Sequence, residues 1–376
     1  MTLDDVVSAV AETSGLAVDE RSAGARQVVV LQGARRRHAF TVTGPEMLAP
    51  EDVPHAVNER VLGASLLYEI NVEGVLDGHV ASAVRFAHRL AAAGAGAVHD
   101  RQTDEVWARK GGRTVAKPEP KTRVAALDLD WFCWRDAVTD DAVRAFLHAA
   151  RRYLPEALPR RFGSYEPLRG KFEESGDEGF IEAWREDEWL FGRATVPVTS
   201  FSLSGGKPEA RPRKVWHLGL HLLADPFREQ RWQDPLERLF VELADALPAF
   251  LATAVVKRDH IWNGRELMVD RNTEKMLSLN QAWQGWMGLP PIPPWWTWYG
   301  KPYTELVTSH LGDAVTSTSR GLLHKISGPP ADGDVAAATP DPLAGTGLRA
   351  VLGEELPHQY IRELRRASVI PEALQE

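Results

Sequence analysis

The segment from Trp283 to Tyr303 holds five of the chain's 13 tryptophans and five of its 25 prolines within 21 residues. Each proline fixes its own φ angle, lacks a backbone N–H donor and keeps the preceding residue out of the α region. We therefore expect no ordinary helix or central strand through this segment, which we call the aromatic–proline block, and an extended backbone over Leu289 to Trp295. Its aromatic side chains are either a plug that seals a core or an exposed anchor for a partner protein. The plug is the simpler interpretation for most of them.

The composition is that of a globular protein with room for two domains. The chain has 376 residues, of which 44% are hydrophobic and 26% are charged, and this length can bury a substantial core. No apolar run is long enough to cross a bilayer and the start is acidic, so we expect a cytoplasmic protein with no membrane partner. The single cysteine, Cys133, excludes a disulfide framework and a Cys-based zinc cluster. The net charge of −8 argues against nonspecific nucleic-acid binding, which needs a basic face.

Much of the negative charge falls in one short stretch, Glu173 to Glu188, which we call the acidic segment. It holds eight acidic residues and one base, Arg185, and therefore carries a charge of −7. Most such runs are solvated faces that keep a protein soluble. A run of this kind can also attract a basic partner and speed its association. The acids that we consider for partner contact are Glu173, Glu174, Glu186, Asp187 and Glu188.

Hydrophobic periodicity predicts an α+β chain of two sandwich-like domains with mixed or antiparallel sheets. Residues 1–115 form the first domain, and the charged, Gly- and Pro-rich stretch 110–122 has the composition of a linker. Residues 122–326 form the main domain. In it we expect strands over 123–131 and 214–223, and helices over 139–153 and from Asp234 onward.

The end of the chain is predicted to be a linker followed by a helix. Residues 327–346 are rich in Pro, Gly and Ala, which is typical of a flexible loop. Residues 347–376 are predicted to be a C-terminal helical segment. Its helix would run from Pro357 to Arg366, with the proline at the first helical position.

The motif search finds no catalytic, cofactor-binding or metal-ligating pattern, so we expect neither a cofactor nor enzymatic activity. His217 and His221 are four residues apart, but the alternation around them indicates a strand. Their Cα atoms would then lie ~13 Å apart, too far to share one metal ion. Asp128 and Asp130 lie on one face of a strand and resemble the Asp-x-Asp start of haloacid-dehalogenase-type phosphotransferases, although Phe132 stands where that pattern has Thr or Val.

The stretch Arg160 to Pro167 can hold polar groups in fixed directions, because it places charged residues beside glycine and proline. Arg161 and Glu166 either pair with each other across a turn or meet a ligand. Pairing is the simpler interpretation, and both residues are kept as candidates for partner contact.

Three stretches together resemble the bacterial immunity proteins of polymorphic toxin systems, closest to the family called immunity protein 52. They are Leu158 to Pro167, Gly288 to Tyr303 and Ala367 to Pro371. The resemblance covers roughly residues 120–376, and residues 95–100 are similar to N-terminal modules of such proteins. It implies an α+β protein without enzymatic activity that binds and neutralises a cognate toxin. It supplies no catalytic residues, because immunity proteins act by occlusion.

The leading hypothesis is therefore a binding protein that blocks a cognate protein toxin. The acidic segment would complement a basic active-site cleft, such as that of a nuclease. Four aromatic residues would supply anchors if they are exposed: Trp295, Trp296, Tyr299 and Tyr303. An alternative is a hydrolase with a composite site of Asp128, Asp130 and His217 brought together by the fold. A third hypothesis is a scaffold module of a secretion or defence apparatus.

Overall fold

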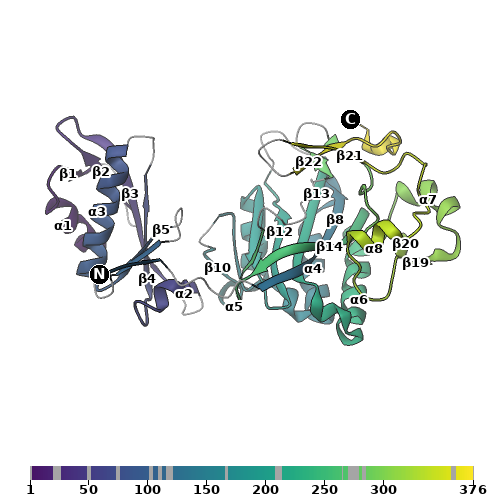
Figure 1. Cartoon of the computed structure of the whole chain (residues 1–376), viewed down its shortest axis with the longest axis horizontal. Coiled ribbons are helices and arrows are strands. Elements are labelled where there is room, and N and C mark those ends of the chain that lie inside the picture. Colours follow the sequence, from purple (N-terminus) through teal and green to yellow (C-terminus); the bar gives the residue numbers. More distant parts are fainter. Residues whose placement is uncertain are drawn as a thin grey trace. The chain divides into compact units, whose positions relative to one another are not determined.

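The fold is that of an α+β protein in two compact units, Met1–Glu119 and Pro120–Glu376. The computed structural model describes residues 2–19, 27–48, 52–72, 77–100, 105–108, 112–115, 122–165, 168–207, 214–264, 266–269, 279–281, 285–356 and 361–375. Each unit combines helices with antiparallel sheets (Figure 1), which confirms the predicted fold class. Within the described ranges, no helix has the length and apolar character needed to cross a bilayer.

The first unit packs two helices against a four-stranded sheet. The sheet consists of β1 (Leu16–Val18), β2 (Gln27–Gln32), β3 (Arg37–Met47) and β4 (Leu66–Asn71), which are neighbours in the order of the sequence. Helices α1 (Leu3–Ala11) and α3 (Asp77–Ala93) bury Val6 and Phe86 against Phe40 of β3. A short helix, α2 (His55–Asn58), precedes β4. A second sheet holds β5 (Ala97–Asp100), β6 (Glu105–Ala108) and β7 (Gly112–Val115).

The second unit is built on one large antiparallel sheet. Its strands are β8 (Thr122–Trp134), β9 (Arg161–Gly163), β10 (Gly170–Lys171), β11 (Trp189–Arg193), β12 (Val198–Ser204), β13 (Val215–Leu223), β14 (Ala249–Trp262), β18 (Trp296–Tyr299), β19 (Val315–Ser317) and β20 (Leu322–Lys325). They lie side by side in the order β10, β9, β11, β12, β13, β8, β14, β18, β20, β19. A short strand, β15 (Leu267–Met268), pairs with the end of β14.

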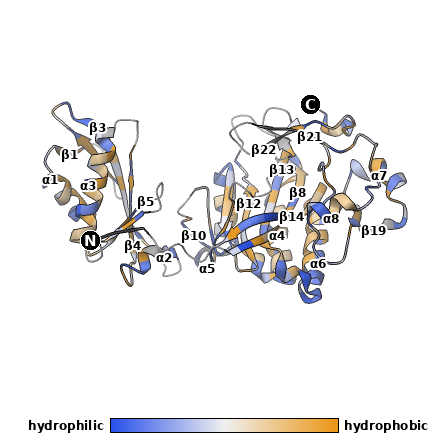
Figure 2. Cartoon of the chain, viewed as in Figure 1, coloured by the Kyte–Doolittle hydropathy of each residue, from blue (hydrophilic) through white to orange (hydrophobic). Residues whose placement is uncertain are grey.

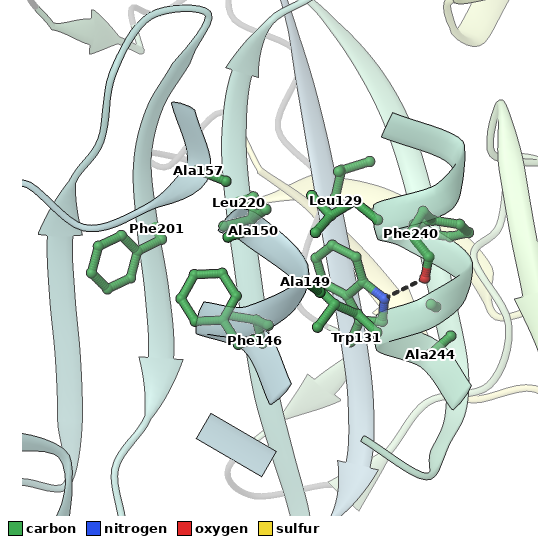
Figure 3. Close-up of a cluster of buried hydrophobic side chains, with 14 of the residues drawn as sticks. Leu129, Trp131, Phe146, Ala149, Ala150, Ala157, Phe201, Leu220, Phe240 and Ala244 are labelled. Atoms are coloured by element: carbon green, nitrogen blue, oxygen red, sulfur yellow. Dashed lines mark hydrogen bonds between the residues drawn. The ribbon is translucent and has the colours of Figure 1, made fainter. Parts of the chain in front are cut away.

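One face of this sheet is covered by helices α4 (Asp140–Tyr153), α5 (Phe172–Glu186) and α6 (Gln230–Ala246). Figure 3 shows Phe146 of α4 and Phe240 of α6 against the side chains of β8, β12 and β13. The indole N–H of Trp131 on β8 donates to the backbone oxygen of Phe240, at 3.0 Å. Both α4 and α6 carry hydrophobic and hydrophilic residues in Figure 2, as amphipathic helices do. Burial of each large apolar side chain here contributes about 1.5–3 kcal/mol.

The aromatic–proline block contributes Trp295, Trp296 and Trp298 to the core beneath the helices and other side chains to a smaller core on the opposite face of the sheet. Trp286, Met287, Leu289 and Tyr303 are buried there against Phe132 and Leu251. The short strand β16 (Asn280–Gln281) precedes the block, its partner β17 (Gly285–Trp286) lies within it, and helix α7 (Tyr303–Leu311) begins at its last residue. The prediction that no central strand passes through it is wrong, because β18 lies between β14 and β20. Its four residues contain no proline, so every backbone N–H in β18 is available to the sheet.

Two predictions for the end of the chain are also wrong. In place of the helix predicted over Pro357–Arg366, the structure has a hairpin of β21 (Val351–Leu356) and β22 (Ile361–Arg365), while 357–360 lie outside the described residues. Cross-strand pairing overrides the local helix signal, and Leu364 is buried in the smaller core.

Residues 327–346 belong to the second unit and do not form a separate linker. They include α8 (Gly333–Ala338), and the side chains of Ala331, Ala336 and Leu343 are buried. Asp341 forms an ion pair with Arg349, 2.6 Å from Oδ2 to Nε, and Arg349 also donates to the backbone oxygen of Pro290. Low aromatic content therefore did not prevent this segment from packing.

Candidate functional site

The face of the large sheet opposite the three helices carries polar side chains near its centre. On β8, Leu127, Leu129 and Trp131 point toward the helices, so the alternation of the strand places Asp128 and Asp130 on the other face. The same alternation applies to β13. There, Leu218 and Leu220 face the helices, and His217 and His221 lie on the polar side, in a strand as predicted.

Strand pairing brings these four residues together as two Asp–His pairs. In the register of β13 with β8, His221 is opposite Asp128 and Gly219 is opposite Asp130. His217 Nε2 lies 2.7 Å from Asp130 Oδ1, and His221 Nδ1 lies 2.9 Å from Asp128 Oδ1. The composite constellation that the hydrolase hypothesis requires is thus partly formed, since Asp130 and His217 are in contact. Asp128 is held by His221 instead.

Asp128 is further fixed by Lys257, a residue that no sequence motif indicated. The Nζ atom of Lys257 on β14 lies 2.5 Å from Asp128 Oδ2, and the Asp128 side chain is 7% exposed. Burial alone would raise the pKa of Asp128, but the charges of Lys257 and His221 and their hydrogen bonds hold that pKa well below its usual range. For His221, burial favours the neutral ring, and the Asp128 carboxylate reverses this and raises the pKa. Asp128 and His221 therefore form an ion pair between β8 and β13.

Gly219 explains how His217 reaches Asp130. A Cβ atom at this position would lie 2.9 Å from Cε1 of His217, 3.2 Å from Oγ of Ser202 and 3.3 Å from Oδ1 of Asp130. The absence of a side chain at Gly219 leaves the space in which these three polar groups converge. Both members of the Asp130–His217 pair are partly exposed, at 26% and 21% of their side-chain surface.

The chemistry of this face does not include a metal centre in the part of the chain that the structure describes. No group of three or more His, Cys, Asp or Glu side chains lies close enough there to hold an ion. His217 and His221 each bind a different aspartate. The two histidines therefore act as separate partners of two carboxylates.

An open hollow of about 360 Å³ lies near the Asp130–His217 pair, and we call it the acidic–aromatic hollow. Its lining residues are Ser164, Asp187, Glu188, Trp189, Phe191 and Lys207. The ring centroids of Trp189 and Phe191 lie 6.4 Å apart with planes tilted by 13°, and the Trp189 ring lies 6.5 Å from that of His217. Trp189 thus connects the hollow to the Asp130–His217 pair. Phe191 is 43% exposed.

The backbone of the two acids in the hollow is held by the turn after β12. Gly205 N donates to the carbonyl oxygen of Glu188 at 2.7 Å, and Lys207 N donates to that of Asp187 at 3.2 Å. A Cβ atom on Gly205 would collide with the carbonyl oxygen of Asp187, so the close approach of the two segments requires glycine at this position. The positions of Asp187 and Glu188 are therefore set by the fold.

Several other acids of the acidic segment form ion pairs within the protein. Glu178 lies 2.5 Å from Arg144 on α4, and Asp177 pairs with Arg151 on the same helix. Glu174 lies 2.7 Å from Lys171. Of the predicted contact acids, Glu173 and Glu186 are exposed, while Asp187 and Glu188 line the hollow. The segment is thus less negative as a surface than its sequence suggests.

The proposed aromatic anchors are not exposed, so that prediction is wrong. The side chains of Trp295, Trp296 and Tyr299 are 1% exposed and Tyr303 is fully buried. Trp295 stacks on Trp296 with ring centroids 3.9 Å apart. The Trp286 indole N–H donates to the Tyr303 hydroxyl at 2.7 Å. Their large apolar area is more stable inside the protein than in water, which makes the plug the correct interpretation.

Of the candidates Arg161 and Glu166, the structure describes the first. Arg161 lies on β9, half-buried, opposite Arg193 of β11 and Lys171 of β10. Glu166 lies outside the described residues. The predicted pairing of these two residues is therefore still a prediction.

Comparison with known proteins gives no family assignment. No family model matches this chain, and no curated protein matches it. Among solved structures, the chain is similar to the Pseudomonas aeruginosa T6SS protein PA0821, with 11% sequence identity and a TM-score of 0.40. That match covers 56% of this chain and 72% of the other. A likeness at this level carries no argument about function, and the resemblance to immunity protein 52 stays a prediction.

Proposed function

We propose that this protein binds and neutralises a cognate protein toxin, and that the polar face of the large sheet is its contact surface. The observation that supports this is the acidic–aromatic hollow, whose lining includes the acidic residues Asp187 and Glu188 and the aromatic residues Trp189 and Phe191. Partly exposed aromatic side chains are typical of the energetic centre of protein interfaces. Carboxylates beside them attract a basic partner and raise its association rate.

This surface would neutralise the toxin by covering a basic cleft that holds the toxin's active site. The toxin's catalytic residues would be covered when the hollow and the neighbouring Asp130–His217 pair lie over them. Because the backbone of Asp187 and Glu188 is already held by Gly205 and Lys207, little backbone entropy is lost there when the complex forms. This proposal needs no catalytic group in the protein itself.

The experiment is capture of the tagged protein from its source organism, with the product of the adjacent reading frame as the named candidate. We expect stoichiometric capture of that product and loss of its toxic activity when equimolar purified protein is added. If the neighbour is expressed but is neither captured nor inhibited, the proposal is wrong.

A hydrolase is the second candidate, and the contact between Asp130 and His217 favours it. An aspartate that orients a histidine is a common arrangement for general-base catalysis, and Ser202 Oγ lies near the same point. Turnover of activated ester substrates that is lost in His217→Gln would support this activity. Equal rates for the wild type and His217→Gln would exclude it for those substrates.

A further inference from the structure

We propose that the acidic–aromatic hollow is a binding site for an arginine side chain of the partner protein. This inference rests on the proposed function and names the group by which the partner would be recognised. The ligand class follows from the lining, which combines two carboxylates, two aromatic rings and one base. A planar cation is the group that can use both the carboxylates and the rings.

The carboxylates provide the charge. Asp187 and Glu188 outnumber Lys207 in the lining, which leaves a net charge of −1 there. A guanidinium can donate two parallel hydrogen bonds to a carboxylate, whereas an ammonium acts as a point charge. Asp187 lies two residues before Trp189 on extended backbone, so its carboxylate lies on the side of the rings and offers an arginine a bidentate partner, while Glu188 adds negative charge to the lining.

The aromatic rings provide the flat surface. Trp189 and Phe191 are two residues apart on β11, so both side chains lie on the same face of the strand. Their planes are nearly parallel. A guanidinium stacks on such a ring face and is attracted by its negative quadrupole, while an anion is repelled by it. The rings thus select against a carboxylate or phosphate ligand at the same place.

The strands on either side of β11 place small residues opposite the two rings. Phe191 is opposite Gly163 in the pairing of β11 with β9, and Ser164 follows in the lining. On the other side, Trp189 is opposite Ser204 of β12, and the turn at Gly205 and Gly206 comes next. Because β11 is paired on both sides, the rings are fixed on a rigid strand.

The test is a nuclear magnetic resonance titration of the intact protein with N-acetyl-arginine methylamide. The indole N–H resonance of Trp189, assigned with Trp189→Phe, reports on the hollow. We expect a saturable shift with a dissociation constant on the order of 1 mM. N-acetyl-citrulline methylamide has nearly the same shape without the charge, and we expect it to bind at least about tenfold more weakly.

The charge variant Asp187→Asn/Glu188→Gln should weaken binding of the arginine compound by about tenfold or more. Its matched control is Glu173→Gln/Glu182→Gln, which removes the same charge from exposed positions of the acidic segment and should leave the affinity unchanged. An unchanged urea midpoint shows that each variant is folded. Equal binding of the citrulline compound, or full affinity of the Asp187→Asn/Glu188→Gln variant, would overturn the inference.

The outcomes separate this inference from the proposed function. Selective arginine binding without inhibition of any toxin would support the hollow's chemistry and contradict the toxin-binding role. A toxin that binds equally well to the wild type and to Asp187→Asn/Glu188→Gln would support the role and contradict the arginine site.

Discussion

The aromatic–proline block and the acidic segment are the two most biased stretches of this chain, and the structure places them in different environments. Most of the block's aromatic side chains are buried. The acidic segment stays at the surface, but Asp177 and Glu178 pair with arginines of α4. Both stretches thus find partners within the protein. Asp187 and Glu188 differ from these acids, because they line the surface hollow beside two rings that composition alone did not indicate, and we propose this hollow as the contact site.

The largest expected effect is on the free energy of unfolding, when a buried aromatic side chain is removed rather than an exposed one. Trp298→Ala should lower the free energy of unfolding of the second unit by about 3–5 kcal/mol, because it removes a side chain that is 1% exposed and leaves a cavity. Urea unfolding followed by tryptophan fluorescence measures this, since Trp107 is the only tryptophan in residues 1–119. The matched control, Phe191→Ala on the exposed side, should cost about 1 kcal/mol or less. Equal losses would contradict the assignment of the block as core.

The next largest loss of stability is expected for a change at Asp128. This acid is buried, whereas many acids of the acidic segment are exposed. Asp128→Asn should lower the free energy of unfolding by about 2 kcal/mol, since it removes the carboxylate that Lys257 and His221 share. Both partners are partly exposed, which reduces the cost below that of a fully buried pair. Urea unfolding at a series of pH values gives the difference between wild type and variant.

That difference should depend on pH in a defined direction. The lowered pKa of Asp128 makes its contribution present above the ordinary carboxyl pKa of about 3.9 and lost as the pH falls further. The raised pKa of His221 makes its contribution full below about 6.5 and lost as the pH rises through the raised value. The penalty of Asp128→Asn should therefore be greatest between about pH 4 and 6.5. A penalty that is constant from pH 3 to 8 would contradict this ion pair.

The smallest effect is expected from the surface ion pairs of the acidic segment. Glu178→Gln removes the partner of Arg144, but both side chains are well exposed and their attraction is screened by water and salt. The urea midpoint should stay at the wild-type value at physiological salt. A loss as large as that of Asp128→Asn would show that the segment stabilises the fold, and would weaken the distinction between the two kinds of acid.

Local periodicity was sufficient to predict much of the fold. The strands near 123–131 and 214–223 and the helix near 139–153 follow from alternation and from apolar spacing, and all three are present as β8, β13 and α4. The C-terminal hairpin was missed, because its pairing of β21 with β22 is a tertiary choice that the helical signal from Pro357 onward conceals.

The candidate site could be predicted only in part. Charge identified Asp187 and Glu188, and the alternation of Trp189 and Phe191 directly after them was a signal that we did not use. The Asp–His pairs depend on register between strands far apart in sequence, since His221 lies 93 residues after Asp128. Sequence patterns within one strand cannot supply that register. Lys257 was missed for the same reason.

The central claim is that Asp187 and Glu188, rather than the acidic segment as a whole, guide the partner to this face. The most direct test is the association rate constant of Asp187→Lys/Glu188→Lys with the captured toxin, measured against Glu173→Lys/Glu182→Lys as a control of equal charge change. We expect the first variant to associate at least about tenfold more slowly at low salt, with a smaller difference at high salt, and the control to change much less. Equal rates for the two variants would contradict the claim.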